Sequence, residues 1–229
     1  TGTSETDVMS QKAVTDEIDQ LAGDVSVKMA NIYTNGDFSN GLTGWSESST
    51  TTTYAIASGI LTATRVTDGA SITLLRAQTG ETPPDSVVYT RYRVRVLQAG
   101  ATSISVNYGA TVNDIISSPN ANQWYDVIDR YTTSSSSSIR SGVRAVYQTD
   151  QALTGYAMEV DYGMQINLTQ MFGSGNEPTK EEFGLLLATL EIDYFEGEIT
   201  IPAQKIMQWQ LALIRKNRNA IIALGGTII

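Results

Sequence analysis

Two close pairs of carboxylates come nearest to a catalytic or metal-binding pattern in this chain. Asp126 and Asp129 form one pair, and Glu159 and Asp161 form the other. Side chains two residues apart on a strand share a face, so Glu159 and Asp161 could hold a metal ion or act as acid and base. Glycosidase chemistry also needs a cleft that brings two carboxyl groups together, and neither spacing indicates one. We therefore expect a protein without enzymatic activity.

The absence of cysteine and histidine limits the chemistry further. None of the 229 residues is Cys or His. This excludes disulfides, thiolate or imidazole metal ligands, and nucleophile–base pairs built on either residue. The sequence also lacks a phosphate-binding loop, a dinucleotide fingerprint and a nucleophile elbow. We expect no organic cofactor.

The aromatic residues offer a different kind of site. The chain has 11 Tyr against 4 Phe, and a Tyr ring tolerates a solvent-exposed edge. Exposed rings stack on sugars while polar groups around them bind the hydroxyls. The sequence therefore predicts a glycan-binding platform made from Tyr54, Tyr92, Tyr108, Trp124 and Tyr147. The alternative is that these rings belong to the hydrophobic core.

The charge of the chain argues against two classes of partner. The net charge is −9, which repels a phosphate backbone, so we expect no nucleic acid partner. Arg215, Lys216 and Arg218 form the densest basic cluster, but they fall late in an expected helix, where cations offset the helix dipole. No apolar run is long enough to span a bilayer, so we expect no membrane insertion.

Residues 1–29 are predicted to form a helix that serves in oligomerisation or attachment. Val8, Val14, Ile18, Leu21 and Val25 recur at steps near three and four, which gives a narrow apolar stripe. A helix of this length is marginal alone in water and needs a partner. We expect copies of the helix to associate as a homo-oligomer, with a trimer favoured. The alternative is packing on the same chain.

From residue 31 the pattern changes to short strands separated by Gly, Pro, Asn and Ser turns. In residues 86–97, apolar Val88, Tyr92 and Val94 share one parity, whereas arginines occupy the other, which is typical of a strand with one buried face. No helix of crossover length lies between the strands, so we expect an antiparallel β-sandwich over residues 30–172. The strand candidates are residues 51–57, 60–66, 70–77, 86–97, 103–108, 123–131, 139–147 and 155–168.

A turn and two helices are expected over residues 173–229. Thr179 and Glu182 have the spacing of a capping box at a helix over residues 179–190. Phe183, Leu186, Leu187 and Leu190 would form its apolar face. Thr200 and Pro202 are expected to start a longer helix that reaches about Leu224.

Residues 35–45 read NGDFSNGLTGW, and residues 158–161 read MEVD. These two runs resemble the opening element and the closing strand of carbohydrate-binding modules with a jelly-roll β-sandwich. The resemblance implies a jelly-roll fold and a glycan ligand. It also implies a structural calcium site in which Asp161 matches one ligand position and Asp37 is the substitute for the other. Ser39 stands where those modules commonly have Glu, which removes one charged ligand from that calcium site.

Two further runs resemble segments of bacteriophage tail and tail-fibre proteins. Residues 6–16 read TDVMSQKAVTD, and residues 167–179 read NLTQMFGSGNEPT and are followed at 194–197 by YFEG. The resemblance implies a non-enzymatic structural protein of the virion tail, assembled in the bacterial host cytoplasm among other virion proteins. Its sandwich would contact host-surface polysaccharide. The alternatives are an assembly adaptor or collar protein that binds no glycan, and an accessory module of a glycan-active enzyme.

Overall fold

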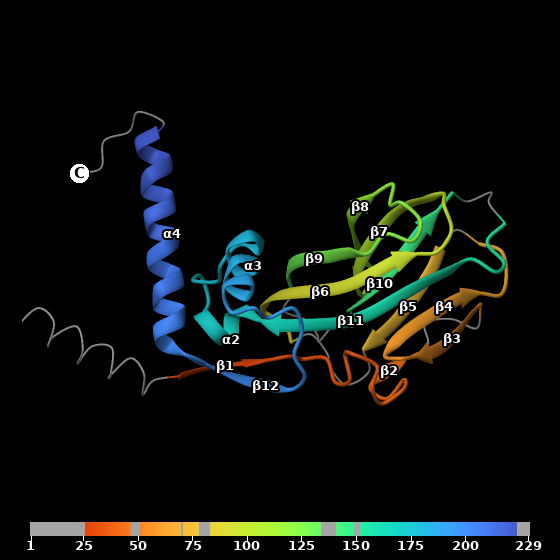
Figure 1. Cartoon of the computed structure of the whole chain (residues 1–229), viewed down its shortest axis with the longest axis horizontal. Coiled ribbons are helices and arrows are strands. Elements are labelled where there is room, and N and C mark those ends of the chain that lie inside the picture. The colour runs from red at the N-terminus through yellow and green to blue at the C-terminus, as the bar shows by residue number, and fades with distance from the viewer. Residues whose placement is uncertain are drawn as a thin grey trace, which may run out of the picture. The chain divides into compact units, whose positions relative to one another are not determined.

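The computed structural model describes residues 26–46, 51–69, 71–77, 83–133, 141–148 and 152–223 (Figure 1). The chain divides into two compact units, and each is treated by itself. The larger unit is Ala30–Glu198, and the smaller unit combines Thr1–Met29 with Ile199–Ile229. Most of the expected N-terminal helix, including its apolar stripe, lies outside the described residues.

The larger unit contains a sandwich of two five-stranded sheets. One sheet, here the first sheet, has the order β3 (Thr52–Ala57), β4 (Ile60–Arg65), β11 (Ala157–Asn167), β6 (Val87–Val96), β9 (Tyr125–Thr132). The second sheet has the order β2 (Trp45–Ser46), β5 (Ser71–Ala77), β10 (Ser141–Tyr147), β7 (Ala101–Tyr108), β8 (Thr111–Ser117). All pairings described within these two sheets are antiparallel. The prediction of a mainly β, jelly-roll-type antiparallel sandwich is confirmed.

The alternation expected for the arginine-bearing strand is confirmed in β6. Val88, Tyr92 and Val94 are fully buried in the space between the sheets. Arg91, Arg93 and Arg95 take the opposite parity and form ion pairs on the outer face of the first sheet. A strand that alternates in this way fixes its own register, because a slip by one residue would bury three guanidinium groups.

The core lies between the two sheets and draws on both of them. Burying a Val, Leu or Ile side chain stabilises the fold by about 1.5–3 kcal/mol, so a shared core of this kind holds the sheets face to face. Trp45 is buried here, and its indole Nε1 donates to the Asn35 carbonyl at 2.7 Å. Other core residues are Leu61, Ala63, Val160 and Met158 from the first sheet and Ile72, Ile104, Val106, Val143 and Ala145 from the second.

Two helices follow the last strand of the sandwich. α2 (Leu168–Phe172) begins directly after β11, and Asn167 caps it by accepting from the Gln170 amide. α3 (Lys180–Thr189) has the predicted capping box between Thr179 and Glu182. Its buried face holds Phe183, Leu186 and Leu187, as the spacing indicated. The Phe183 ring packs edge-on against Tyr89 of β6, with the ring centres 4.9 Å apart.

The turn after α3, residues 190–197, binds the opening loop of the sandwich. The Glu196 carboxylate accepts from the backbone amides of Asn35 at 2.7 Å and Gly36 at 3.2 Å. Asn31 donates through its side chain to the Phe195 carbonyl and through its backbone to the Gly197 carbonyl. We expected the sandwich domain to end at residue 172. The compact unit extends to Glu198 instead, because α3 and this turn pack on the sandwich.

The smaller unit contains α4 (Ala203–Ala223) and all but one residue each of β1 (Ser26–Ala30) and β12 (Glu198–Pro202). β1 and β12 form a two-stranded sheet. Residues 26–29 were expected to end a helix and residues 200–202 to begin one. Both predictions are wrong, because the two segments satisfy their backbone groups by pairing with each other. α4 buries Ile206 and Trp209 but leaves Met207, Leu211 and Ile214 exposed. Among the described helices, none is long and apolar enough to cross a membrane.

Candidate functional site

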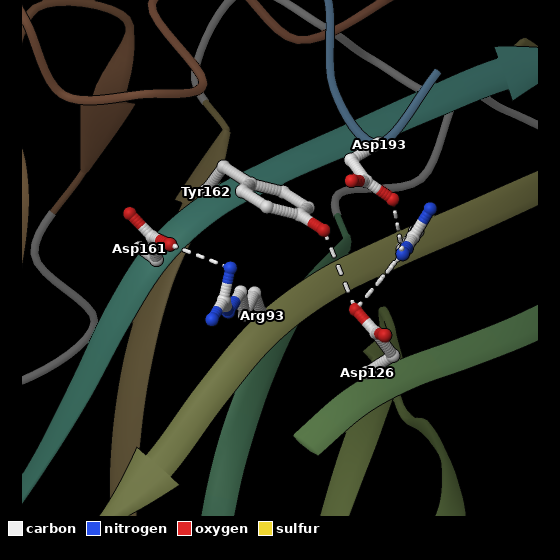
Figure 2. Close-up of polar contacts among 6 residues, drawn as sticks. Arg93, Asp126, Asp161, Tyr162 and Asp193 are labelled. Atoms are coloured by element: carbon white, nitrogen blue, oxygen red, sulfur yellow. Dashed lines mark hydrogen bonds and ion pairs between the residues drawn. The ribbon is translucent and has the colours of Figure 1, made fainter. Parts of the chain in front are cut away.

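A polar pocket lies on the outer face of the first sheet. Its volume is about 270 Å³, and it is lined by Arg91, Arg93, Trp124, Asp126, Tyr162 and Asp193. We call it the arginine–tryptophan pocket. Figure 2 shows its polar side chains meeting over β6, β9 and β11, with Asp161 beside them. All of these residues belong to the larger unit.

Strand pairing places three of the lining residues side by side. Arg93 on β6 lies opposite Asp126 on β9 and opposite Tyr162 on β11. Directly opposed residues on adjacent strands have Cβ atoms about 4.5–5.5 Å apart, which is close enough for their side chains to form one surface. The floor of the pocket is therefore a row of three side chains across three strands.

An irregularity in β11 adds a fourth group to this surface. The register shifts between Val160 and Tyr162, as a β-bulge does. Asp161 and Tyr162 therefore both contact the arginine side of the sheet. Asp161 pairs with Arg93 at 3.6 Å, and the Arg91 guanidinium lies over the Tyr162 ring, 5.8 Å from its centre. Without the bulge, consecutive residues would point to opposite faces.

Arg91 is the centre of the polar contacts. Its guanidinium lies 3.1 Å from Asp126 Oδ1 and 3.1 Å from Asp193 Oδ1. Burial lowers the pKa of Arg91, but the neighbouring Tyr162 and Asp126 raise that pKa above its usual value, so the cation is kept. Burial also raises the pKa of the Tyr162 hydroxyl, and this group donates to Asp126 Oδ1 at 3.3 Å. The pocket therefore keeps fixed charges and a fixed donor at neutral pH.

Trp124 forms the aromatic part of the pocket. It precedes β9 by one residue and is half-buried. Arg93 and Arg95 contact its ring, with guanidinium carbons 5.4 and 4.7 Å from the ring centre. Arg95 is itself held by Glu159 at 2.5 Å. Both cations are attracted to the electron-rich face of the indole, and the two contacts hold the ring in place.

The turn after α3 supplies Asp193 to the pocket. Tyr194, the next residue, stacks on Tyr162 with ring centres 5.4 Å apart. The Tyr194 hydroxyl donates to Glu196, the residue that binds the opening loop. Burial raises the pKa of Tyr194, and the adjacent Glu196 raises that pKa further, which keeps this hydroxyl a donor. The turn that carries Asp193 is therefore held in place both by the stacking of Tyr194 on Tyr162 and by the bonds that Glu196 makes.

The structure brings one of the five predicted platform aromatics into the pocket, namely Trp124. The prediction is wrong for Tyr92, Tyr108 and Tyr147, because their side chains are buried in the sandwich core and present no ring face to a ligand. Tyr54 is half-buried on β3, where its hydroxyl donates to the Thr73 carbonyl at 3.3 Å. It does not line the pocket.

In each of the two carboxylate pairs, the two members contact different partners. Asp126 lies in the pocket, whereas Asp129 is buried and accepts from Asn113 Nδ2 at 2.7 Å. Glu159 and Asp161 share the arginine face, as expected, but each faces its own arginine. Neither pair therefore forms two free carboxyl groups facing a common cleft.

The residues expected to hold calcium do not fit that role. Asp37 accepts from the Ser39 amide at 3.1 Å and so closes its own turn. Asp161 faces the Arg93 guanidinium, a cation that repels a metal ion. In the part of the chain that the structure describes, no three carboxylate, His or Cys residues gather closely enough to hold a metal.

Nothing in the sequence indicated that Arg91, Tyr162 and Asp193 lie together. Each of the three lies in a different feature of the fold: Arg91 on the alternating strand β6, Tyr162 at the bulge of β11, and Asp193 in the turn after α3. The arginines on alternate positions of β6 were visible as an outward face. Asp193 was not foreseeable, because its contact with Arg91 spans 102 residues.

No protein-family model matches the chain, and no curated protein matches its sequence. Solved structures do resemble its fold. One is an arabinose-bound α-L-arabinofuranosidase, MgGH51, at 12% identity and a TM-score of 0.47; the match covers 72% of this chain and 30% of that enzyme.

The other neighbours include carbohydrate-binding modules. A family 16 carbohydrate-binding module matches at 14% identity and a TM-score of 0.40, covering 59% of this chain and 99% of the module. The xylan-binding CBM22-1 domain of Xyn10C from Paenibacillus barcinonensis matches at 13% identity and a TM-score of 0.39, covering 62% of this chain and 92% of that domain.

Proposed function

We propose that this chain is a non-enzymatic structural protein of a bacteriophage tail or tail fibre, and that its sandwich binds host-surface glycan in the arginine–tryptophan pocket. The observation that carries the glycan part is the half-exposed Trp124 ring beside exposed carboxylates in one surface pocket. A sugar needs an aromatic face for its apolar C–H groups and acceptors or donors for its hydroxyls. The pocket offers an aromatic face, acceptors and donors.

The contacts describe how a sugar would bind. The Trp124 ring would receive the apolar face of a pyranose. Asp126 and Asp193 would accept from its hydroxyls, and the guanidinium of Arg93 would donate to ring or hydroxyl oxygens. Because the ion pairs already hold these groups in place, little side-chain freedom would be lost on binding.

The tail assignment rests on the sequence resemblance of residues 6–16 and 167–179 to tail and tail-fibre segments. In this proposal the chain is part of the virion, contacts other virion proteins and forms a homo-oligomer, with a trimer favoured. The exposed stripe of Met207, Leu211 and Ile214 on α4 supports association, because isolated apolar side chains spaced four and three residues apart are typical of helix–helix seams.

A second candidate is an assembly adaptor whose sandwich binds no glycan. It is favoured by one observation: three of the five aromatic residues that could have formed a sugar platform are buried in the core.

Binding of the purified chain to an array of bacterial surface polysaccharides, followed by calorimetry, separates these functions. Replacing Trp124→Ala should weaken binding roughly tenfold, because a stacking ring contributes about 0.5–1.5 kcal/mol beyond the area that it buries, and about 1.4 kcal/mol is tenfold in affinity. Tyr54→Ala is the matched control, since Tyr54 is also half-buried but does not line the pocket.

Each outcome has a distinct meaning. Equal loss in both variants would place the ligand elsewhere on the sandwich. No binding across the array would favour the adaptor, and depolymerisation of a bound polysaccharide would contradict the non-enzymatic assignment.

A further inference from the structure

Three arginines at alternate positions of one strand are usually the pattern of an anion-binding surface. Arg91, Arg93 and Arg95 have this spacing on β6, and all three reach the outer face of the first sheet. Their contacts, however, decide against an acidic ligand. The charge of the ligand that the pocket accepts depends on which charged side chains that ligand meets first.

Arg91 lies beneath the carboxylates that surround it. Its side chain is 12% exposed, whereas Asp126 is 47% exposed and Asp193 is 84% exposed. A ligand that enters the pocket therefore meets two carboxylates before it can reach the guanidinium. A carboxylate or phosphate on that ligand would be repelled by both.

The other two arginines are each paired with a carboxylate, although the Arg93 side chain, at 45% exposed, also faces an incoming ligand. Arg95 is held by Glu159 at 2.5 Å, and Arg93 lies 3.6 Å from Asp161. Both guanidinium groups also lie against the Trp124 ring. The row thus sets three cations against four carboxylates, namely Asp126, Glu159, Asp161 and Asp193. The net charge of −9 on the whole chain acts in the same direction.

We infer that the arginine–tryptophan pocket selects uncharged, hydroxyl-rich glycan and excludes acidic polysaccharides that carry uronate, sialate or phosphate groups. This inference rests on the proposed glycan-binding function and adds the class of sugar. Exposed carboxylates accept hydrogen bonds from hydroxyls, and pairs of oxygens on one carboxylate suit neighbouring hydroxyls on a sugar ring. Arg91 and Arg95 hold the acceptors and Trp124 in place, and Arg93 remains the donor to the sugar.

The experiment uses chemical conversion of the glycans themselves. The full chain is tested on an array that carries neutral glucans, galactans and mannans together with polygalacturonate, polysialate and a phosphate-bridged teichoic acid. Each neutral polymer that binds is then oxidised at its primary hydroxyls to carboxylates, and the two carboxylate polymers, polygalacturonate and polysialate, are tested again after carboxyl reduction. Affinity is measured by calorimetry at two salt concentrations.

The inference expects neutral polymers to bind and their oxidised forms to bind roughly tenfold or more weakly, with the difference shrinking as salt rises. Binding of acidic polymers that is lost on carboxyl reduction would overturn the inference but leave glycan binding intact. No binding to any polymer would overturn the proposed function and the inference together.

Asp193→Asn tests the cause of the exclusion. Removing the charge of the most exposed carboxylate should raise the affinity for the oxidised polymer, relative to the affinity of the same variant for the neutral polymer, by roughly threefold to tenfold. Asp85→Asn is the matched control, because Asp85 is an exposed aspartate outside the pocket with a positive φ of 47° that Asn tolerates. Equal gains in both variants, or no gain in Asp193→Asn, would contradict the inference.

Discussion

The Arg91 guanidinium and the Asp193 carboxylate lie 3.1 Å apart, although 102 residues separate them in the chain. The contact joins β6 of the first sheet to the turn that follows α3. The pocket therefore depends on segments from both sides of the expected boundary at residue 172. A protein truncated there would retain Trp124 and the arginines but lose one wall.

The two partners in this contact should differ in their effect on stability. Asp193→Asn should change the free energy of unfolding by less than about 1 kcal/mol, because an exposed ion pair contributes little. Arg91→Leu should cost about 1–3 kcal/mol, since Arg91 is mostly buried, packs on Tyr162 and leaves Asp126 without its cation. Chemical denaturation of both variants measures the difference. Equal losses of stability would contradict the prediction that Arg91 contributes more than Asp193.

Glu196 should stabilise the fold through the opening loop. Glu196→Ala removes two bonds to backbone amides and should lower the free energy of unfolding by about 1–2 kcal/mol, because hydrogen bonds to a charged group are stronger than neutral ones. Glu181→Ala is the control, since Glu181 has the same charge and lies exposed on α3. A similar loss in both variants would point to net charge instead of the two bonds.

How much of this could be read from the sequence depends on whether the signal was local. The eight strand candidates all appear as strands, because alternation and turn residues mark them directly. The capping box at Thr179 and the apolar face of α3 were predictable for the same reason. The strands β1, β2, β8 and β12 were missed. β2 is two residues long, and the pairing of β12 with β1 is a contact between the two ends of the chain.

The candidate site was only partly predictable. A Tyr on a strand can point inward or outward, and a bulge or a neighbouring strand decides which. Tyr92 sits on the core parity of β6, which the valines around it already indicated. Tyr162 reaches the outer face because of a register shift that the sequence does not mark. Composition favoured exposed tyrosines, whereas Tyr33, Tyr92 and Tyr108 are fully buried or nearly so.

A buried tyrosine network should make the fold sensitive to high pH. The Tyr33 hydroxyl bonds with those of Tyr92, at 2.8 Å, and Ser141. Burial raises the pKa of Tyr33 from 10.0 to about 12. A raised pKa means that its contribution to stability is complete below pH 10 and is lost as the pH rises towards 12.

Alkaline titration checks this. Tyrosinate absorbance from the buried rings should appear together with loss of near-ultraviolet circular dichroism, and Tyr33→Phe should make the loss of stability less steep between pH 10 and 12. The same variant should cost about 1 kcal/mol at neutral pH, because two hydroxyls lose a partner. Ionisation of these rings without unfolding would contradict the assignment of the network to the core.

The absence of cysteine gives a direct test of the proposed homo-oligomer. Ile214→Cys places a single thiol on the exposed stripe of α4, so any disulfide must join two copies. We expect rapid dimer formation under mild oxidation, measured on a non-reducing gel. Leu185→Cys on α3 is the control, since Leu185 is 44% exposed but lies outside the stripe. Equal crosslinking of both variants, or a monomeric mass for the unmodified chain, would argue against association through α4.

The contacts of Asn31 have a mechanical consequence. Asn31 stands near the first residue of the larger unit and Gly197 near the last, and the backbone of one donates to the carbonyl of the other at 2.8 Å. Asn31 Nδ2 and Glu196 add further bonds across the same closure. A tensile load applied through the two ends of this unit would act first on these bonds. The hydrogen bonds between the strands of the sandwich, and the pocket on its outer face, would bear the load only after these bonds at the two ends of the unit had broken.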